Sequence, residues 1–133
     1  MTFTRRALLT ALAAFSAVPA SAEALESEVL YPATSHNFGD LVIAAQEPVL
    51  LYVWAPWCSV CRRTTPQLQK TALALREQVT FATLNYDDAP ALARQMNVRG
   101  VPTLLLFRQG NIRGSRSGFI SADRLENWIL ARL

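Results

Sequence analysis

Both cysteines of this 133-residue chain lie in one stretch, Trp54-Ala55-Pro56-Trp57-Cys58-Ser59-Val60-Cys61. The run that leads into it, Val49 to Trp54, is apolar and aromatic over a length typical of a buried strand. Because only two residues separate the cysteines, both thiols fit in the first turn of a helix that follows this strand. The stretch therefore predicts a redox pair at a junction between a strand and a helix.

Two other uses of a cysteine pair are disfavoured. A structural disulfide stabilises a fold by closing a long loop, and this pair closes almost none. A structural zinc ion needs four ligands, whereas the chain offers two cysteines and one distant histidine, His36, which we expect to be a solvent-facing helix residue. We therefore expect a functional disulfide, with no metal and no other cofactor.

The first 22 residues have the pattern of a secretory signal peptide. Arg5 and Arg6 form a basic start, the run from Ala7 to Val18 is mostly apolar, and Ala20-Ser21-Ala22 is a small-residue cleavage signal. This run is too short to span a bilayer as a helix, which needs about 20 residues. We expect cleavage after Ala22, leaving a domain at residues 23–133 with no membrane anchor. The paired arginines also resemble a twin-arginine export signal, so both export routes stay open.

Removal of this leader changes the charge of the chain. It takes away two of the 13 basic residues and none of the 10 acidic ones, which leaves a net charge of about +1. No basic block remains that would indicate nucleic acid or an anionic membrane surface as a partner. The remaining length suits one domain.

Strand and helix patterns alternate along this domain. We expect strands at 28–31, 49–54, 79–85, 103–107 and 112–117, with the first ended by Pro32 and the last two joined by a hairpin turn at 109–111. Helices are expected from Thr34 or Ser35 to Gln46, from Cys58 to Arg76 with a kink at Pro66, from Asp87 or Asp88 to Asn97, and from Ser121 onward. This order predicts an α/β fold with a central mixed sheet of four to five strands, flanked by helices on both faces.

The chain resembles the thioredoxin family. The family pattern W-x-x-W-C-x-x-C is matched by Trp54, Trp57, Cys58 and Cys61. Pro66 lies where thioredoxins have the proline that kinks the active-site helix, and the segment 99–103 is similar to the loop that carries the family's cis-proline. The resemblance spans residues 26–133 and implies the thioredoxin fold.

The resemblance also implies roles for the residues of this stretch. Cys58 is expected to be the nucleophile, because a helix N-terminus favours a thiolate, and Cys61 is expected to displace the mixed disulfide. Substrate contacts are implied for Pro56, Trp57, Val101 and Pro102. The family pattern implies a cis bond before Pro102, although an X-Pro bond is more often trans when chemistry alone is considered. Trp54 is expected to pack beneath the active-site loop.

Two departures from the family concern the inner cysteine. Thioredoxins usually place a buried aspartate two positions before the first tryptophan and a lysine on the neighbouring strand, where this chain has Tyr52 and Thr83. Without a carboxylate beneath Cys61, its deprotonation would rely on water, the partner protein or another group. Ser59-Val60 replaces the Gly-Pro of common thioredoxins, which alters the reduction potential.

Together these features predict an exported thiol-disulfide oxidoreductase that reduces protein disulfides in a bacterial periplasm. The periplasm is kept oxidising, so a reductant there needs electrons from a membrane-embedded thiol donor. Its substrates would be proteins with disulfides or thiols, and we expect a monomer. Net oxidation or isomerisation of protein thiols is the alternative within the enzyme class, although the chain lacks the large helical insertion of dedicated oxidants. A thioredoxin-fold binding or chaperone module is the alternative outside it.

Overall fold

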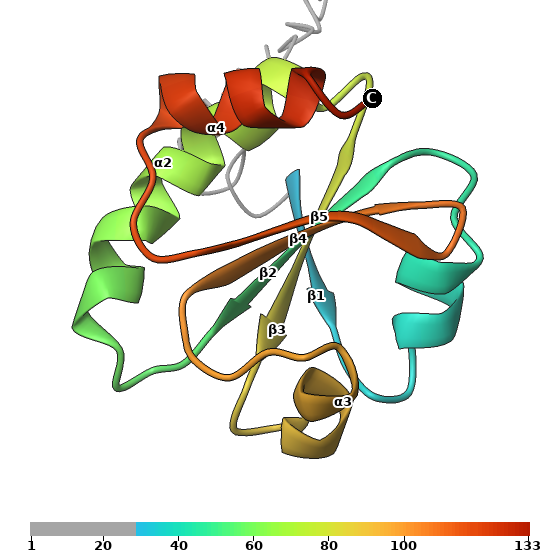
Figure 1. Ribbon diagram of the computed structural model, residues 1–133, viewed down its shortest axis with the longest axis vertical. Coiled ribbons are helices and arrows are strands. Elements are labelled where there is room, and N and C mark those ends of the chain that lie inside the picture. Colours follow the sequence, from blue (N-terminus) through green and yellow to red (C-terminus); the bar gives the residue numbers. More distant parts are fainter. Residues whose placement is uncertain (1–28) are drawn as a thin grey trace, which may run out of the picture.

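The computed structural model describes residues 29–133, so the predicted signal peptide at residues 1–22 lies outside the described residues. The elements follow the predicted alternation of strands and helices (Figure 1). In chain order they are β1 (Leu30–Ala33), η1 (Gly39–Ile43), β2 (Val49–Trp54), α2 (Ser59–Leu75), β3 (Thr80–Asn85), α3 (Pro90–Gln95), β4 (Thr103–Arg108), β5 (Asn111–Ser117) and α4 (Ala122–Leu130).

The five strands form one mixed sheet in the order β1-β3-β2-β4-β5. Strands β1, β3 and β2 run parallel, whereas β4 is antiparallel to β2 and β5 is antiparallel to β4. Strand β2 is therefore the central strand, and its carboxyl end leads directly into the two cysteines. The predicted mixed sheet, with helices on both faces, is confirmed.

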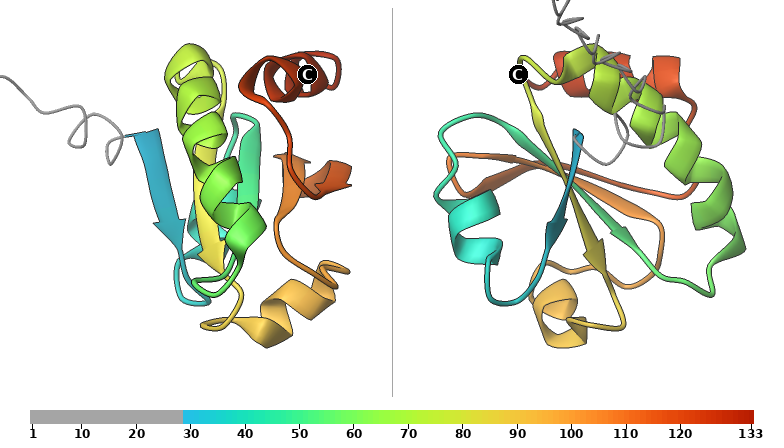
Figure 2. Two further views of the ribbon diagram at one scale, coloured as in Figure 1. Left: turned by 90° about the vertical axis from the view of Figure 1, so that its left-hand side faces the viewer. Right: turned by 180° about the vertical axis from the view of Figure 1, so that it is seen from behind.

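The central strand β2 separates two apolar cores. Leu50 and Tyr52 belong to the core beneath α2 and α4, whereas Leu51 and Val53 belong to the core beneath η1 and α3. This division follows from the alternation of side chains along a strand. Figure 2 shows α2 and α4 together on one face of the sheet. Because β2 is buried on both faces, its carboxyl end is a rigid support for the residues that follow.

Helix α2 contains Pro66 and packs one side against the sheet. Leu68, Ala72 and Leu75, which recur at helical spacing, are buried on this side. Its neighbour α4 starts where predicted, with Ser121 at the N-cap position, but the Ser121 side chain makes no capping hydrogen bond. Instead, the Gln67 side-chain oxygen accepts the hydrogen bond of the Ala122 N–H at 2.9 Å. A residue of α2 thus caps α4.

The region between β1 and β2 differs from the prediction. Strand β1 continues through Pro32 to Ala33, because an edge strand tolerates a residue without an N–H. The predicted helix from Thr34 or Ser35 to Gln46 is reduced to one wide turn, η1. The Thr34 hydroxyl accepts from the N–H groups of His36 and Asn37, so local turn bonds replace the start of a longer helix.

The hairpin between β4 and β5 is confirmed, and its turn depends on backbone angles that glycine favours. Gln109 and Gly110 have φ values of 50° and 77°, which matches the two-residue hairpin turn with two positive φ angles. A Cβ at Gly110 would also lie 3.1 Å from the carbonyl oxygen of Ile43. This position therefore requires glycine on two grounds.

A second glycine lets α4 approach the edge of the sheet. A Cβ at Gly114 in β5 would lie 2.9 Å from the Trp128 ring and 2.9 Å from the Arg132 side chain. The Arg132 guanidinium lies 4.4 Å from the centroid of the Trp128 ring.

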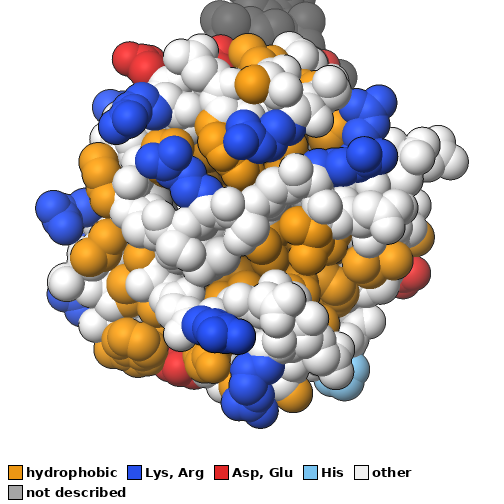
Figure 3. Space-filling model, in the orientation of Figure 1, with side chains coloured by type: hydrophobic (Ala, Val, Ile, Leu, Met, Phe, Trp, Pro, Cys, Tyr) orange, Lys and Arg blue, Asp and Glu red, His pale blue; other side chains and the backbone are white. Residues whose placement is uncertain are grey.

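Figure 3 shows basic side chains scattered over this face among apolar and uncharged atoms. Among residues 29–133, no helix has both the length and the apolar character needed to cross a membrane.

Candidate active site

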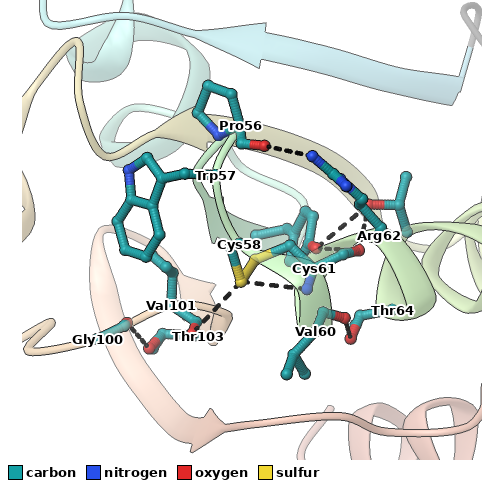
Figure 4. The surroundings of a disulfide bond; sticks show 12 residues. Pro56, Trp57, Cys58, Val60, Cys61, Arg62, Thr64, Gly100, Val101 and Thr103 are labelled. Atoms are coloured by element: carbon teal, nitrogen blue, oxygen red, sulfur yellow. Dashed lines mark hydrogen bonds between the residues drawn. A yellow bond between two sulfur atoms is a disulfide. The ribbon is translucent and has the colours of Figure 1, made fainter.

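A disulfide joins Cys58 and Cys61 at the start of α2 (Figure 4). Cys58 is the N-cap residue, with extended backbone angles, and Cys61 lies in the first turn. Their Cα atoms are 5.3 Å apart, within the usual range for a disulfide. The structure thus places both cysteines where the strand-to-helix pattern predicted them.

The sulfur of Cys58 occupies the position of a helix-capping acceptor. The Cys61 N–H donates to the Cys58 Sγ at 3.2 Å. Unpaired N–H groups and the positive end of the helix dipole favour a negative charge at this position. When the disulfide opens, the Cys58 sulfur is therefore the one better stabilised as a thiolate, which is the nucleophilic form.

The loop before β4 lies against the disulfide. The peptide bond between Val101 and Pro102 is cis, and the Cys58 Sγ lies 3.7 Å from the Val101 carbonyl oxygen. Two bonds hold this loop, since the Gly118 N–H donates to the Pro102 carbonyl at 3.0 Å and the Thr103 hydroxyl donates to the Gly100 carbonyl at 2.7 Å. The structure therefore brings Val101 and Pro102 to Cys58, although 43 residues separate Val101 from it in the sequence.

Trp57 forms an exposed apolar rim beside the disulfide. Its side chain is 66% exposed, and its indole N–H points to the two carboxylate oxygens of Asp87, at 3.1 and 3.2 Å. A shallow cavity of about 130 Å³ lies between Trp57 and the loop that holds Val101. Asp87 or Asp88 is predicted to start the next helix, but the first residue of α3 is Pro90. The partnership with Trp57 was missed, because no local pattern links residues this far apart.

The two residues on either side of Ala55 differ in burial. Pro56 is exposed, and its carbonyl oxygen accepts from the Arg62 guanidinium at 3.4 Å. Trp54 is half-buried and packs against the core beneath α2, in agreement with its predicted packing role. Pro56 and Trp57, for which the family resemblance implies substrate contact, are therefore both exposed, as is Ser59.

Tyr52 lies directly behind the inner cysteine. Its side chain is 1% exposed, and its hydroxyl donates to the Cys61 carbonyl oxygen at 3.1 Å. The same hydroxyl lies 3.2 Å from the Thr65 Oγ1. Burial raises the pKa of Tyr52, and the hydrogen bond with Thr65 opposes this in part. The sequence marks Tyr52 as a departure from the family pattern, but it does not predict the bond to Cys61.

A cavity of about 250 Å³ adjoins Tyr52. It is lined by side chains that carry no ionised group at neutral pH, namely Leu30, Pro32, Tyr52, Trp54, Thr65 and Thr83. Thr83 is the strand partner of Tyr52 in the β2–β3 register. The two positions that depart from the family pattern are therefore neighbours, and both line this cavity.

No metal cluster is found among residues 29–133, where no three His, Cys, Asp or Glu side chains come together. His36 is exposed and lies in the turn before η1, rather than in the predicted helix.

Comparison with known proteins agrees with this geometry. The thioredoxin family model matches residues 29–131. The thioredoxin of Rhodospirillum rubrum is 35% identical over 95 residues, which cover 71% of this chain and 91% of that protein. The thioredoxin of Haemophilus influenzae is 35% identical over 103 residues, which cover 77% of this chain and 95% of that protein. For the thioredoxin of Pseudomonas aeruginosa the identity is 32% over 107 residues, covering 80% of this chain and 99% of that protein.

Proposed function

This chain belongs to the thioredoxin family, as a disulfide oxidoreductase with a Cys58–Cys61 pair, and we propose that it reduces protein disulfides in the periplasm. The observation that carries the proposal is the position of the Cys58 sulfur, at the N-cap of α2 and 3.7 Å from the Val101 carbonyl oxygen. A thiolate there is stabilised by the helix start and faces a loop that offers backbone groups to an extended polypeptide.

The reaction proceeds in two exchanges. The Cys58 thiolate attacks one sulfur of the substrate disulfide, forming a Cys58–substrate bond and releasing the other substrate sulfur as a thiolate, which takes a proton from solvent. Cys61, after losing its proton, attacks the Cys58 sulfur and releases the second substrate thiolate. Two electrons pass to the substrate, and the Cys58–Cys61 disulfide is formed. Pro56, Trp57, Val101 and Pro102 border the reacting sulfurs and contact the substrate.

Three observations support the proposed compartment and the proposed direction of electron flow. The leader at residues 1–22 has the pattern of an export signal, and the similar proteins are named thioredoxins. Within the described part of the chain, only the short helix α3 lies between β3 and β4, which argues against a dedicated oxidant with a helical insertion. In an oxidising periplasm a membrane-embedded thiol donor reduces the Cys58–Cys61 disulfide again after each cycle. It works as a monomer, with its own disulfide as the sole redox group.

An insulin reduction assay tests the activity. The purified exported protein, with dithiothreitol as the electron source, should precipitate the insulin B chain, and Cys58→Ser should abolish this. Thr71→Val is a suitable control, because Thr71 lies in the same helix and its hydroxyl bonds to Gln67 and Ala122 rather than to the site. Insulin reduction that survives in Cys58→Ser would contradict the assigned nucleophile, and no reduction by the unaltered protein would favour a binding module.

The redox state of the Cys58–Cys61 pair in the cell tests the proposed direction of electron flow. Cells are quenched with acid, free thiols are alkylated, and the exported fraction is analysed by mass. A reductant should be recovered mostly as the dithiol, beginning at Glu23, and should become oxidised when the membrane donor is absent. Recovery mostly as the disulfide in donor-competent cells would indicate a net oxidant, and a cytoplasmic form that begins at Met1 would contradict the proposed compartment.

A further inference from the structure

Two of the contacts that hold Cys61 in place differ in chemical kind. The first is the disulfide to Cys58, which is broken and formed again in each catalytic cycle. The second is the hydrogen bond from the Tyr52 hydroxyl to the Cys61 carbonyl oxygen, at 3.1 Å. Tyr52 belongs to β2, which is buried along almost its whole length. When the disulfide is open, the second tie still joins the first turn of α2 to the central strand.

We propose that Tyr52 is a positioning residue for Cys61, holding the first turn of α2 against β2 while the disulfide is open. The inference concerns the exchange chemistry of the pair and does not depend on the net direction of electron flow. It assigns to the Tyr52 hydroxyl the task of keeping Cys61 where its sulfur reaches Cys58.

Thr65 strengthens this arrangement. Its hydroxyl donates to the same Cys61 carbonyl oxygen at 2.9 Å and lies 3.2 Å from the Tyr52 hydroxyl. The Cys61 carbonyl oxygen thus accepts from two hydroxyls that lie close to each other, and one of them reaches it from β2. One residue further along, Pro66 has no N–H to donate to the Arg62 carbonyl, so the same turn lacks one helical bond. The bond from β2 therefore supports a turn that is weaker than an uninterrupted helix.

The protonation of Tyr52 suits this role. Because burial raises the pKa of its hydroxyl above the ordinary value of 10.0, the group stays protonated and remains a donor at neutral pH. A phenylalanine at this position would keep the ring within the core but would leave the Cys61 carbonyl without this donor. The hydroxyl can therefore be tested separately from the packing of the ring.

The step that depends on this positioning is the intramolecular exchange. After Cys58 has formed a mixed disulfide, the Cys61 thiolate donates its electron pair to the Cys58 sulfur, the Cys58–substrate bond breaks, and the substrate sulfur leaves as a thiolate. The rate of such a step depends on how often the two sulfurs meet in the reactive geometry. Loosening of the first turn lowers that frequency. The preceding attack by Cys58 does not need the two sulfurs to meet, so it depends on this turn only through the Cys61 N–H that donates to the Cys58 Sγ, and it should change less.

Glutathione disulfide is the probe for the test. Reduced protein is mixed with it at several concentrations, quenched rapidly with acid and analysed by mass, so that the chain carrying one glutathione is counted over time. The concentration-dependent rate reports the attack by Cys58, and the concentration-independent rate reports the displacement by Cys61. In Tyr52→Phe the second rate should fall about fivefold, the equivalent of one ordinary hydrogen bond, while the first rate stays within twofold of the original.

Two further variants make the test decisive. Thr65→Val keeps the Tyr52 ring and should lower the displacement rate in the same direction, whereas Thr71→Val, which removes a buried hydroxyl elsewhere in α2, should leave both rates unchanged. The equilibrium with glutathione in Tyr52→Phe should also shift toward the dithiol by up to about fivefold. An unchanged displacement rate in folded Tyr52→Phe would overturn the proposal. An equal fall of both rates would also overturn it, because that would indicate a general structural role.

Discussion

The two halves of α2, on either side of Pro66, are held by different interactions. The first half is fixed by polar and covalent ties: the disulfide, the N–H of Cys61 on the Cys58 sulfur, and the Tyr52 hydroxyl on the Cys61 carbonyl. The second half is fixed by packing, with Leu68, Ala72 and Leu75 buried against the sheet and α4. The reactive end of the helix can therefore change its covalent state while the other end stays docked.

This difference separates reactivity from stability along one helix. Apolar packing contributes most of the free energy of folding, but it is not directional enough to set the position of one sulfur. Hydrogen bonds contribute less free energy, but they fix distances and angles. Substitutions in the second half should therefore act on the free energy of unfolding, and substitutions in the first half should act mainly on the thiols.

The largest expected effect comes from Leu68→Ala. Leu68 is 1% exposed, so its truncation should lower the free energy of unfolding by about 3 kcal/mol, measured by urea denaturation. The insulin reduction rate of the folded variant should stay close to the original. Leu73→Ala is the matched control, because Leu73 lies in the same half but is 38% exposed, and it should cost less than about 0.5 kcal/mol. If Leu68→Ala also slowed the reaction in proportion, the separation of the two halves would fail.

Alkylation of the reduced protein measures the reactivity of the two thiols in the first half of α2. With iodoacetamide near pH 7, Cys58 should be labelled on the order of tenfold faster than Cys61, because the helix start stabilises its thiolate. Peptide mapping by mass spectrometry gives both rates, and the difference should vanish in concentrated guanidinium chloride. Faster labelling of Cys61 would reverse the roles of the two cysteines.

High pH tests the tie between β2 and the first half of α2. Below pH 10 the Tyr52 hydroxyl is protonated in both the folded and the unfolded chain, so its contribution to stability is fully present there. Above pH 10 the unfolded chain loses this proton first, because the folded pKa is raised. The free energy of unfolding should then fall by up to about 1.4 kcal/mol per pH unit until the folded pKa is reached. This part of the fall in the free energy of unfolding at high pH should be absent in Tyr52→Phe. An identical pH profile of stability for the two proteins would contradict a raised pKa of Tyr52 in the folded chain.

The smallest expected effect concerns the hydrogen bond from the Ala122 N–H to the Gln67 side chain, in the second half of α2. Gln67→Ala removes the acceptor of the Ala122 N–H and should cost about 1 kcal/mol in urea denaturation. Ser121→Ala should cost clearly less, because the Ser121 side chain makes no capping bond. The reverse order of these two costs would show that the serine caps α4 in solution.

Much of the fold follows from local patterns that are strong in this chain. The apolar run 49–54 predicted β2 with the same bounds, and the cysteine spacing predicted their place at the start of α2. The segment 109–111 predicted a hairpin turn, and its Gly110 has one of the positive φ angles that the tightest turns need. In each case the determining residues are neighbours in sequence, so the pattern contains the physical cause.

The features that sequence reasoning missed depend on residues far apart in the chain. Asp87 meets Trp57 only because the carboxyl ends of β2 and β3 lie side by side. The length of η1 was overestimated, because turn bonds of Thr34 compete with a helix in a way that periodicity does not reveal. Tyr52 was identified by its departure from a family pattern, but its bond to Cys61 requires the helix to be placed over the strand.

The close approach of Trp128 to Gly114 has a spectroscopic consequence. Of the three tryptophans in the chain, Trp57 lies beside the disulfide and Trp54 packs against the core that contains both cysteines, whereas Trp128 lies on α4 against the edge strand β5. We therefore expect the first two to respond in fluorescence when the disulfide opens, and Trp128 to respond when α4 separates from the sheet. The protein thus contains a built-in optical reporter for its redox state and a separate one for the docking of its last helix.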